Sequence, residues 1–169
     1  MNTLSNLAIW HQGILALAAL LLVTAALWDA WRYRIPNFIS LALLALFPAY
    51  ALTASPPLPW GQHLFIAALV LAAGYYLYSK KYIGAGDIKL LSVASLWAGP
   101  DRVGLLLFIT TIAGGLLALL TAGVTVYRHH KSGASGKASV AKTPIPYGVA
   151  IAIGALCILI MSSHPILFS

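Results

Sequence analysis

Long, solid runs of apolar residues separated by short polar stretches dominate this sequence of 169 residues. Each run is close to the roughly 20 residues that a helix needs to cross a hydrocarbon core about 30 Å thick. The runs lack the alternation over segments of about ten residues that is typical of a transmembrane β-barrel. The pattern predicts an all-α, polytopic membrane protein with about six transmembrane helices. They are expected near residues 8–27, 36–54, 62–79, 87–99, 103–127 and 145–162.

The composition agrees with this class of protein. Hydrophobic residues make up 61% of the chain and charged residues 8%, whereas a soluble domain carries about 25% charged residues. A single cysteine, Cys157, excludes an internal disulfide framework and a CxxC metal site. We expect one membrane-embedded domain over residues 1–169 that uses neither a metal ion nor another cofactor.

Lysine and arginine residues gather in alternate loops. The first, third and fifth loops between the predicted spans carry Arg32, Arg34, Lys80, Lys81, Arg128, Lys131, Lys137 and Lys142. The other two loops hold only Arg102. By the positive-inside rule, the three basic loops lie in the cytoplasm and both termini lie outside it. Because the net charge of +7 follows this topology, it indicates membrane orientation rather than nucleic-acid binding.

The chain has only three acidic residues, Asp29, Asp87 and Asp101, and two of them border apolar runs. Asp29 and Asp87 both fall at predicted cytoplasmic ends of spans. A carboxylate at the centre of a transmembrane helix costs about 2.5–3.5 kcal/mol, and less near the interface. One interpretation is that each aspartate reaches water or pairs with Arg32 or Lys89. The other is that the two share a cavity and act together.

The fourth predicted span favours the second interpretation. From Asp87 to Gly99 the helix would be only about 20 Å long at 1.5 Å per residue, which is too short to cross the core alone. Either the membrane thins locally, or residues 82–87 continue into the bilayer as irregular backbone, which is tolerated at membrane depth where it is buried in protein or lines an aqueous cavity. Gly84 and Gly86 suit such backbone, since glycine permits positive φ. We therefore expect irregular backbone through both glycines, with Asp87 at a helix N-terminus facing a cavity.

Two aspartates in one cavity have a known chemistry. Like charges a few ångströms apart do not both ionise easily, so the pair holds one proton. The ionised member takes a proton from a water that attacks a peptide carbonyl, and the protonated member polarises that carbonyl. Because the pair titrates as a unit, the sequence leaves open which aspartate is the base. A proton or ion transporter is the alternative, since intramembrane carboxylates also mark ion paths; a catalytically inactive scaffold of the same fold is another.

Three short motifs resemble those of the type IV prepilin peptidases, the intramembrane aspartyl proteases that remove prepilin leader peptides. "GAGDIK" (84–89) is similar to the family's GxGDxK motif, "DAWRYRIPN" (29–37) to its other aspartate motif, and "KTPIPYG" (142–148) to its Pro-aromatic-Gly element. The resemblance covers nearly the whole chain and implies that Asp29 and Asp87 are the catalytic pair. The supporting residues that it implies are Gly84, Gly86, Lys89, Pro36, Asn37, Pro146, Tyr147 and Gly148.

The resemblance also implies a branch of the family. Larger members carry a cytoplasmic loop with paired CxxC motifs and an N-methyltransferase activity, whereas this chain has one cysteine and a first basic loop of a few residues. We expect a small, peptidase-only member that serves Flp (tight-adherence) pilins or pseudopilins. It would lie in the bacterial inner membrane with its active site at the cytoplasmic side. Its expected partners are a prepilin, with its leader and hydrophobic helix, and membrane lipid; the oligomeric state is left open.

Overall fold

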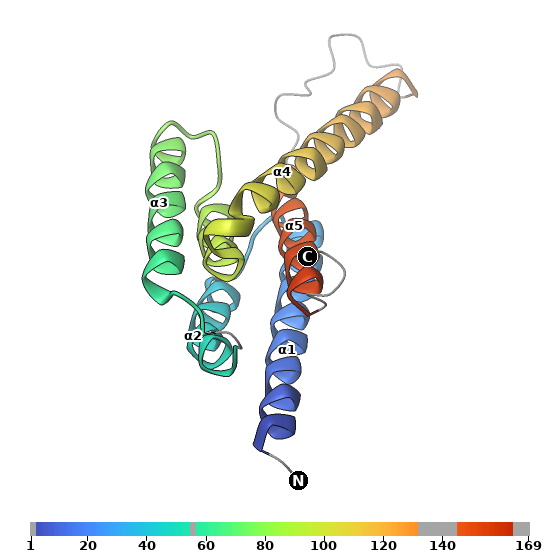
Figure 1. The fold of residues 1–169 in the computed structure, drawn as a ribbon. Helices are drawn as coiled ribbons and strands as arrows, with labels where there is room; N and C mark the ends of the chain where they lie inside the picture. Colours follow the sequence, from blue (N-terminus) through green and yellow to red (C-terminus); the bar gives the residue numbers. More distant parts are fainter. Residues whose placement is uncertain (1–2, 55–56, 132–144, 164–169) are drawn as a thin grey trace.

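The computed structural model describes residues 3–54, 57–131 and 145–163, and every regular element in these ranges is a helix (Figure 1). The elements are α1 (Thr3–Arg32), α2 (Asn37–Thr53), α3 (Trp60–Ser79), α4 (Ala85–Lys131) and α5 (Tyr147–Ser163). Three of them, α1, α3 and α4, are long and apolar enough to cross a membrane, and α2 and α5 are shorter apolar helices. The prediction of an all-α, polytopic membrane protein is confirmed. Residues 142–144 of the third motif lie outside the described residues.

Helix α4 contains both the fourth and the fifth predicted spans. Gly99 interrupts it with φ 69° and ψ −177°, and the second arm of α4 leaves the bundle at an angle to the first (Figure 1). The expected turn between the two spans is therefore a break at one residue, because the helix resumes at Pro100. The five helices, one of them bent into two arms, match the six predicted segments.

His63 of α3 stabilises the break in α4. Because Pro100 has no N–H, the carbonyl of Leu96 loses the donor that a helix would provide four residues later. The Nδ1 atom of His63 lies 2.7 Å from this carbonyl oxygen and replaces that donor. The buried imidazole ring also occupies the space beside Gly99, where a Cβ atom would overlap it. Both the positive φ and the closeness of the ring thus require glycine at position 99.

Replacing Gly99 with alanine should destabilise the protein markedly. A left-handed conformation costs a residue with a Cβ roughly 1–2 kcal/mol, and the overlap with His63 adds to this cost. Thermal unfolding in detergent should show a lower Tm for Gly99→Ala than for Gly104→Ala, because a Cβ at Gly104 meets nothing within 4 Å. Equal Tm values for the two variants would contradict this account of the break.

The first arm of α4 lies at the centre of the bundle. Helices α2, α3 and α5 pack against α4, and α1 packs against α2 and α5. Leu90 and Leu96 in this arm are fully buried or nearly so, and the indole Nε1 of Trp97 donates a hydrogen bond to the Leu43 carbonyl of α2 at 3.1 Å. The first arm therefore holds together elements that are distant in the sequence.

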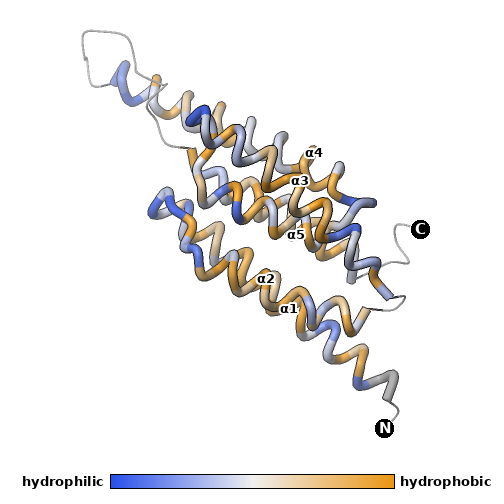
Figure 2. The backbone as a smooth tube through the Cα atoms, turned by 90° about the vertical axis from the view of Figure 1, so that its left-hand side faces the viewer, coloured by the Kyte–Doolittle hydropathy of each residue, from blue (hydrophilic) through white to orange (hydrophobic). Residues whose placement is uncertain are grey.

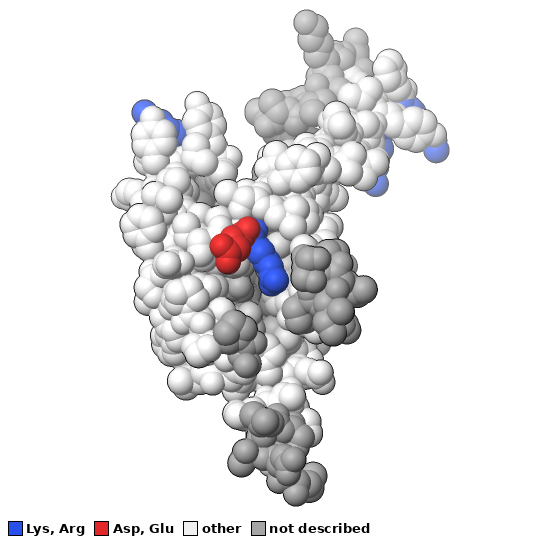
Figure 3. All heavy atoms as spheres, in the orientation of Figure 1, with Lys and Arg blue, Asp and Glu red and all other residues white. Residues whose placement is uncertain are grey.

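One end of the bundle gathers most of the functional candidates. Helices α1 and α3 end there, and α2, α4 and α5 begin there, as the short links and the contact between Asp29 and Gly148 require. We call it the basic end, because Arg32, Arg34, Lys80 and Lys81 lie in or beside its links. Hydrophilic segments occupy the ends of the helices and hydrophobic ones their middle (Figure 2). On the face drawn in Figure 3, basic atoms at the upper left lie where α3 ends, whereas the one acidic cluster on this face lies lower, beside basic atoms over the bend of α4 and not at the basic end.

Candidate active site

The structure brings Asp29 and Asp87 to the basic end from two different helices. Asp29 lies in the last turn of α1, and Asp87 lies in the first turn of α4. The two carboxyl groups are close enough to interact electrostatically. Each lies beside the N-terminus of a helix, Asp29 beside α5 and Asp87 within α4. The fold therefore brings the two aspartates to the same end of the bundle, and their action as a pair stays a prediction.

Asp29 is bound by the backbone of α5. Its side chain is 3% exposed, and its Oδ2 atom accepts a hydrogen bond of 2.7 Å from the N–H of Gly148. The first N–H groups of a helix have no partner within the helix, so Asp29 supplies from α1 the cap that α5 lacks in its own sequence. This contact holds the carboxylate in place.

Asp87 folds back onto the link that precedes its own helix. Its carboxylate accepts a hydrogen bond from the N–H of Gly84, and the Gly84 carbonyl accepts the first bond of α4 from the N–H of Ile88 at 3.2 Å. A Cβ atom on Gly84 would lie 2.8 Å from Oδ2 of Asp87. Gly84 therefore caps α4 and leaves room for the carboxylate.

The expected irregular backbone through Gly86 is wrong. Helix α4 begins at Ala85, so Gly86 is helical, and among the described glycines only Gly99 has a positive φ. Gly86 lacks a side chain for a different reason. A Cβ atom there would lie 3.4 Å from both the Cβ atom and the backbone oxygen of Ile35, so glycine allows the link between α1 and α2 to approach α4 closely.

Ile35 is a site residue that the sequence reasoning missed. It is 9% exposed and lies between the starts of α4 and α5. Its Cδ1 atom is 2.7 Å from the position of a Cβ atom on Gly148, and that same Cβ atom would lie 2.8 Å from Oδ2 of Asp29. The available signal was an isolated apolar residue between Arg34 and a proline in a polar link. Ile35 fixes the spacing of the helices that carry and bind the two carboxylates.

A cleft of about 570 Å³ at the basic end leads to Asp87. Tyrosine residues dominate its wall: Tyr33, Tyr78, Tyr82 and Tyr147 line it together with Lys81 and Asp87. The Tyr147 ring also packs near Gly114 of α4, where a Cβ atom would lie 3.5 Å from Cε1. Two carboxylates in contact with helix N-termini, one of them at the edge of a cleft, provide the groups that aspartic peptidase chemistry needs.

Comparison with known proteins gives a match to the type IV leader peptidase family over residues 16–119. The chain belongs to this family. The matched segment contains both Asp29 and Asp87, and the resemblance seen in the sequence motifs is confirmed. The chain is also similar to a "Prepilin leader peptidase/N-methyltransferase" of Stutzerimonas stutzeri, with 28% identity over 152 residues that cover 85% of this chain and 48% of the relative. It thus spans about half the length of this curated relative. No solved structure gives a significant match.

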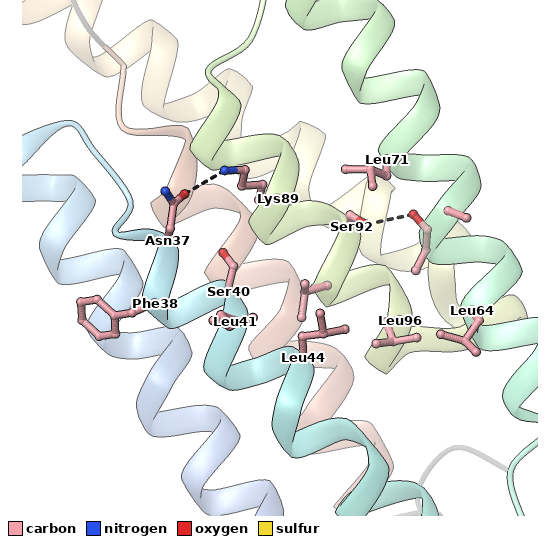
Figure 4. A pocket seen from close by; sticks show the side chains of 13 residues that line it. Asn37, Phe38, Ser40, Leu41, Leu44, Leu64, Leu71, Lys89, Ser92 and Leu96 are labelled. Atoms are coloured by element: carbon pink, nitrogen blue, oxygen red, sulfur yellow. Dashed lines mark hydrogen bonds between the residues drawn. The ribbon is translucent and has the colours of Figure 1, made fainter.

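Lys89, the lysine of the GAGDIK motif, binds a residue of α2. The Nζ atom of Lys89 donates a hydrogen bond of 3.0 Å to Oδ1 of Asn37, the first residue of α2 (Figure 4). Both residues line an apolar groove of about 680 Å³ between α2, α3 and α4. Lys89 therefore joins two of the sequence motifs across α4 and α2.

The motif prolines begin helices. The carbonyl of Pro36 accepts a hydrogen bond from the N–H of Ile39 at 3.1 Å, and the carbonyl of Pro146 accepts one from the N–H of Val149 at 3.2 Å. Proline suits these positions because its φ is already close to the helical value and its missing N–H costs nothing there. The structure thus gives both prolines a helix-starting role at the basic end.

The bond between Lys89 and Asn37 predicts non-additive effects of mutation. Lys89→Met and Asn37→Ala should each lower the free energy of unfolding by about 1 kcal/mol or less, because the pair is exposed. The double variant should be no less stable than the worse single variant, since both remove the same interaction. Unfolding in detergent measures the cycle, with Lys80→Met as the control. Fully additive losses would show that the two residues act separately.

Proposed function

We propose that this chain is an intramembrane aspartic endopeptidase that removes the leader peptide of type IV prepilins, with Asp29 and Asp87 as its catalytic pair. The observation that carries the proposal is the arrangement of the two carboxylates. They come from different helices, interact electrostatically at one end of the bundle, and border a cleft through Asp87. Membership of the type IV leader peptidase family supports the same activity.

In the proposed reaction the pair holds one proton between its two carboxylates. One carboxylate takes a proton from a water molecule while the water oxygen attacks the carbonyl carbon of the scissile bond. The other carboxyl group donates its proton to the carbonyl oxygen. The tetrahedral intermediate then collapses: one of its hydroxyl groups returns its proton to the ionised carboxylate as the C=O bond re-forms, the C–N bond breaks, and the departing nitrogen takes the proton of the other carboxyl group, so the pair again holds one proton. The N–H of Gly148, which donates a hydrogen bond to Asp29, keeps that carboxylate in position during these transfers.

We also propose on which side of the membrane the site lies and which class of prepilin it cleaves. Arg32, Arg34, Lys80 and Lys81 at the basic end support a cytoplasmic location for the site, in a chain that crosses the bacterial inner membrane. Only residues 33–36 link α1 to α2, which supports a peptidase that lacks a methyltransferase domain at this link. We therefore propose Flp-type prepilins or pseudopilins as substrates and one catalytic domain over residues 1–169.

The test is cleavage of prepilins by the purified chain in detergent or nanodiscs. We expect the chain to cut a Flp-type prepilin at its leader junction, identified by mass spectrometry, and to cut it faster than a prepilin substrate of the larger, bifunctional family members. Methyl transfer to the new N-terminus should not occur. A chain that binds but never cuts any prepilin would favour the inactive scaffold. Proton flux into liposomes without cleavage would favour the transporter.

A further inference from the structure

Two helices at the basic end finish with residues in a strained conformation. Tyr33 (φ 51°) and Lys81 (φ 61°) are the only non-glycine residues with positive φ in the part of the chain that the structure describes. Glycine is the usual residue at this position of a helix end, because a Cβ atom disfavours the left-handed conformation. Backbone strain of this kind collects at functional sites. The side chains at these two positions should therefore have a role that glycine would not supply.

Both residues occupy well-formed helix ends. The N–H of Tyr33 donates to the Asp29 carbonyl at 2.8 Å and closes α1. At the end of α3, the N–H of Lys81 donates to the Tyr78 carbonyl at 2.8 Å and that of Tyr82 to the Leu77 carbonyl at 3.1 Å. This pair of bonds is the Schellman motif, whose left-handed residue is most often glycine. The hydrogen bonds need the backbone conformation but neither side chain.

The two strained residues meet at one cleft although they end different helices. Tyr33 and Lys81 both line the cleft beside Asp87, with Tyr78, Tyr82 and Tyr147. The side chains of Tyr33 and Tyr82 are 50% and 74% exposed, so their aromatic faces are available to a ligand. The strained conformation therefore places two large side chains at the cleft. Glycine at either position would give a more stable helix end but would leave the cleft without that side chain.

From this convergence we propose that Tyr33 and Lys81, with the neighbouring tyrosines, form the subsite that binds the leader side of the substrate peptide. The proposal rests on the proposed peptidase function. Tyrosine faces stack on peptide groups and side chains, and the Lys81 ammonium and tyrosine hydroxyls donate to peptide carbonyls. The apolar groove of α2, α3 and α4 has a different lining, mostly leucine and alanine. The cleft therefore suits an extended polar peptide segment outside the hydrocarbon region.

Glycine variants separate this subsite from a structural role. Tyr33→Gly and Lys81→Gly remove the side chains and relieve the strain, so their Tm should be equal to or higher than that of the wild type. Binding of a fluorescent synthetic peptide, a prepilin leader with a few residues after the junction, is measured by anisotropy. Each variant should raise its Kd about tenfold, or about 1.4 kcal/mol. Tyr33→Phe should retain most of the affinity, and the exposed Tyr127→Gly outside the cleft should leave Kd unchanged.

Turnover of a full prepilin gives the second readout. Both glycine variants should raise KM with little change in kcat, because they leave the aspartates untouched. A substrate with a truncated leader should have a higher KM than the full prepilin when the wild type cleaves it. The glycine variants should not raise the KM of this truncated substrate any further. Unchanged Kd and KM, or a lower Tm with lost kcat, would overturn the subsite while cleavage by the wild type still supports the peptidase. Peptide that does not bind the wild type would overturn the subsite whatever the result of the cleavage assay.

Discussion

Asp29→Asn and Asp87→Asn should each reduce leader removal by about 10²–10⁴-fold, the usual contribution of general acid–base catalysis. An amide has nearly the volume of the carboxyl group, but it neither takes a proton from water nor donates one to a carbonyl oxygen. In Asp29→Asn the amide oxygen can still accept the hydrogen bond that the N–H of Gly148 donates to Oδ2 of Asp29 in the wild type. The fold should therefore remain, and Tm should change little.

The measurement is the rate of prepilin cleavage by purified variants, with Tm recorded for each. Asp101→Asn is the matched control, because Asp101 is an exposed carboxylate in α4, and its cleavage rate should equal that of the wild type. The assignment of the pair fails if either of the two site variants cleaves at the wild-type rate. Equal loss in all three variants would instead point to a general effect of charge on the membrane protein.

Gly148→Ala should be the most damaging change that leaves both aspartates in place. A Cβ atom at this position would lie 2.8 Å from Oδ2 of Asp29 and 2.7 Å from Cδ1 of Ile35, so the carboxylate has to leave the N–H at the start of α5. Misplacement of a catalytic group by about 1 Å costs roughly 10²-fold in rate, and overpacking of this kind typically costs about 1–3 kcal/mol of stability.

The control for this variant is Gly104→Ala, where a Cβ atom meets nothing within 4 Å and the residue lies inside α4. It should keep the wild-type cleavage rate and be slightly more stable than the wild type, because alanine has a higher helix propensity than glycine. Adding Ile35→Ala to Gly148→Ala removes one of the two overlaps and should recover part of the stability. A Gly148→Ala enzyme with wild-type rate would show that the contact between Asp29 and α5 is dispensable.

The glycines show that residue type alone does not predict the local backbone conformation. Gly84 and Gly86 both belong to the GAGDIK motif, and from the sequence both are expected to lie in irregular backbone. In the structure Gly84 caps α4, whereas Gly86 is helical and makes room for Ile35. Glycine serves either a conformation or a close approach, and only the neighbouring chain decides between them. The same holds for Gly99, which meets both requirements through His63 of α3.

The helices, their approximate bounds and the shared end of the bundle on which Asp29 and Asp87 lie could all be predicted from the sequence. Long apolar runs are local signals, because a hydrocarbon core requires apolar helices of a definite length to cross it. The contacts of Asp29 with α5 and of Lys89 with Asn37 became visible only in the folded structure. The same holds for the meeting of Tyr33 and Lys81 at one cleft. These contacts join residues far apart in the chain, and they depend on how side chains pack, which neither hydrophobicity nor spacing records.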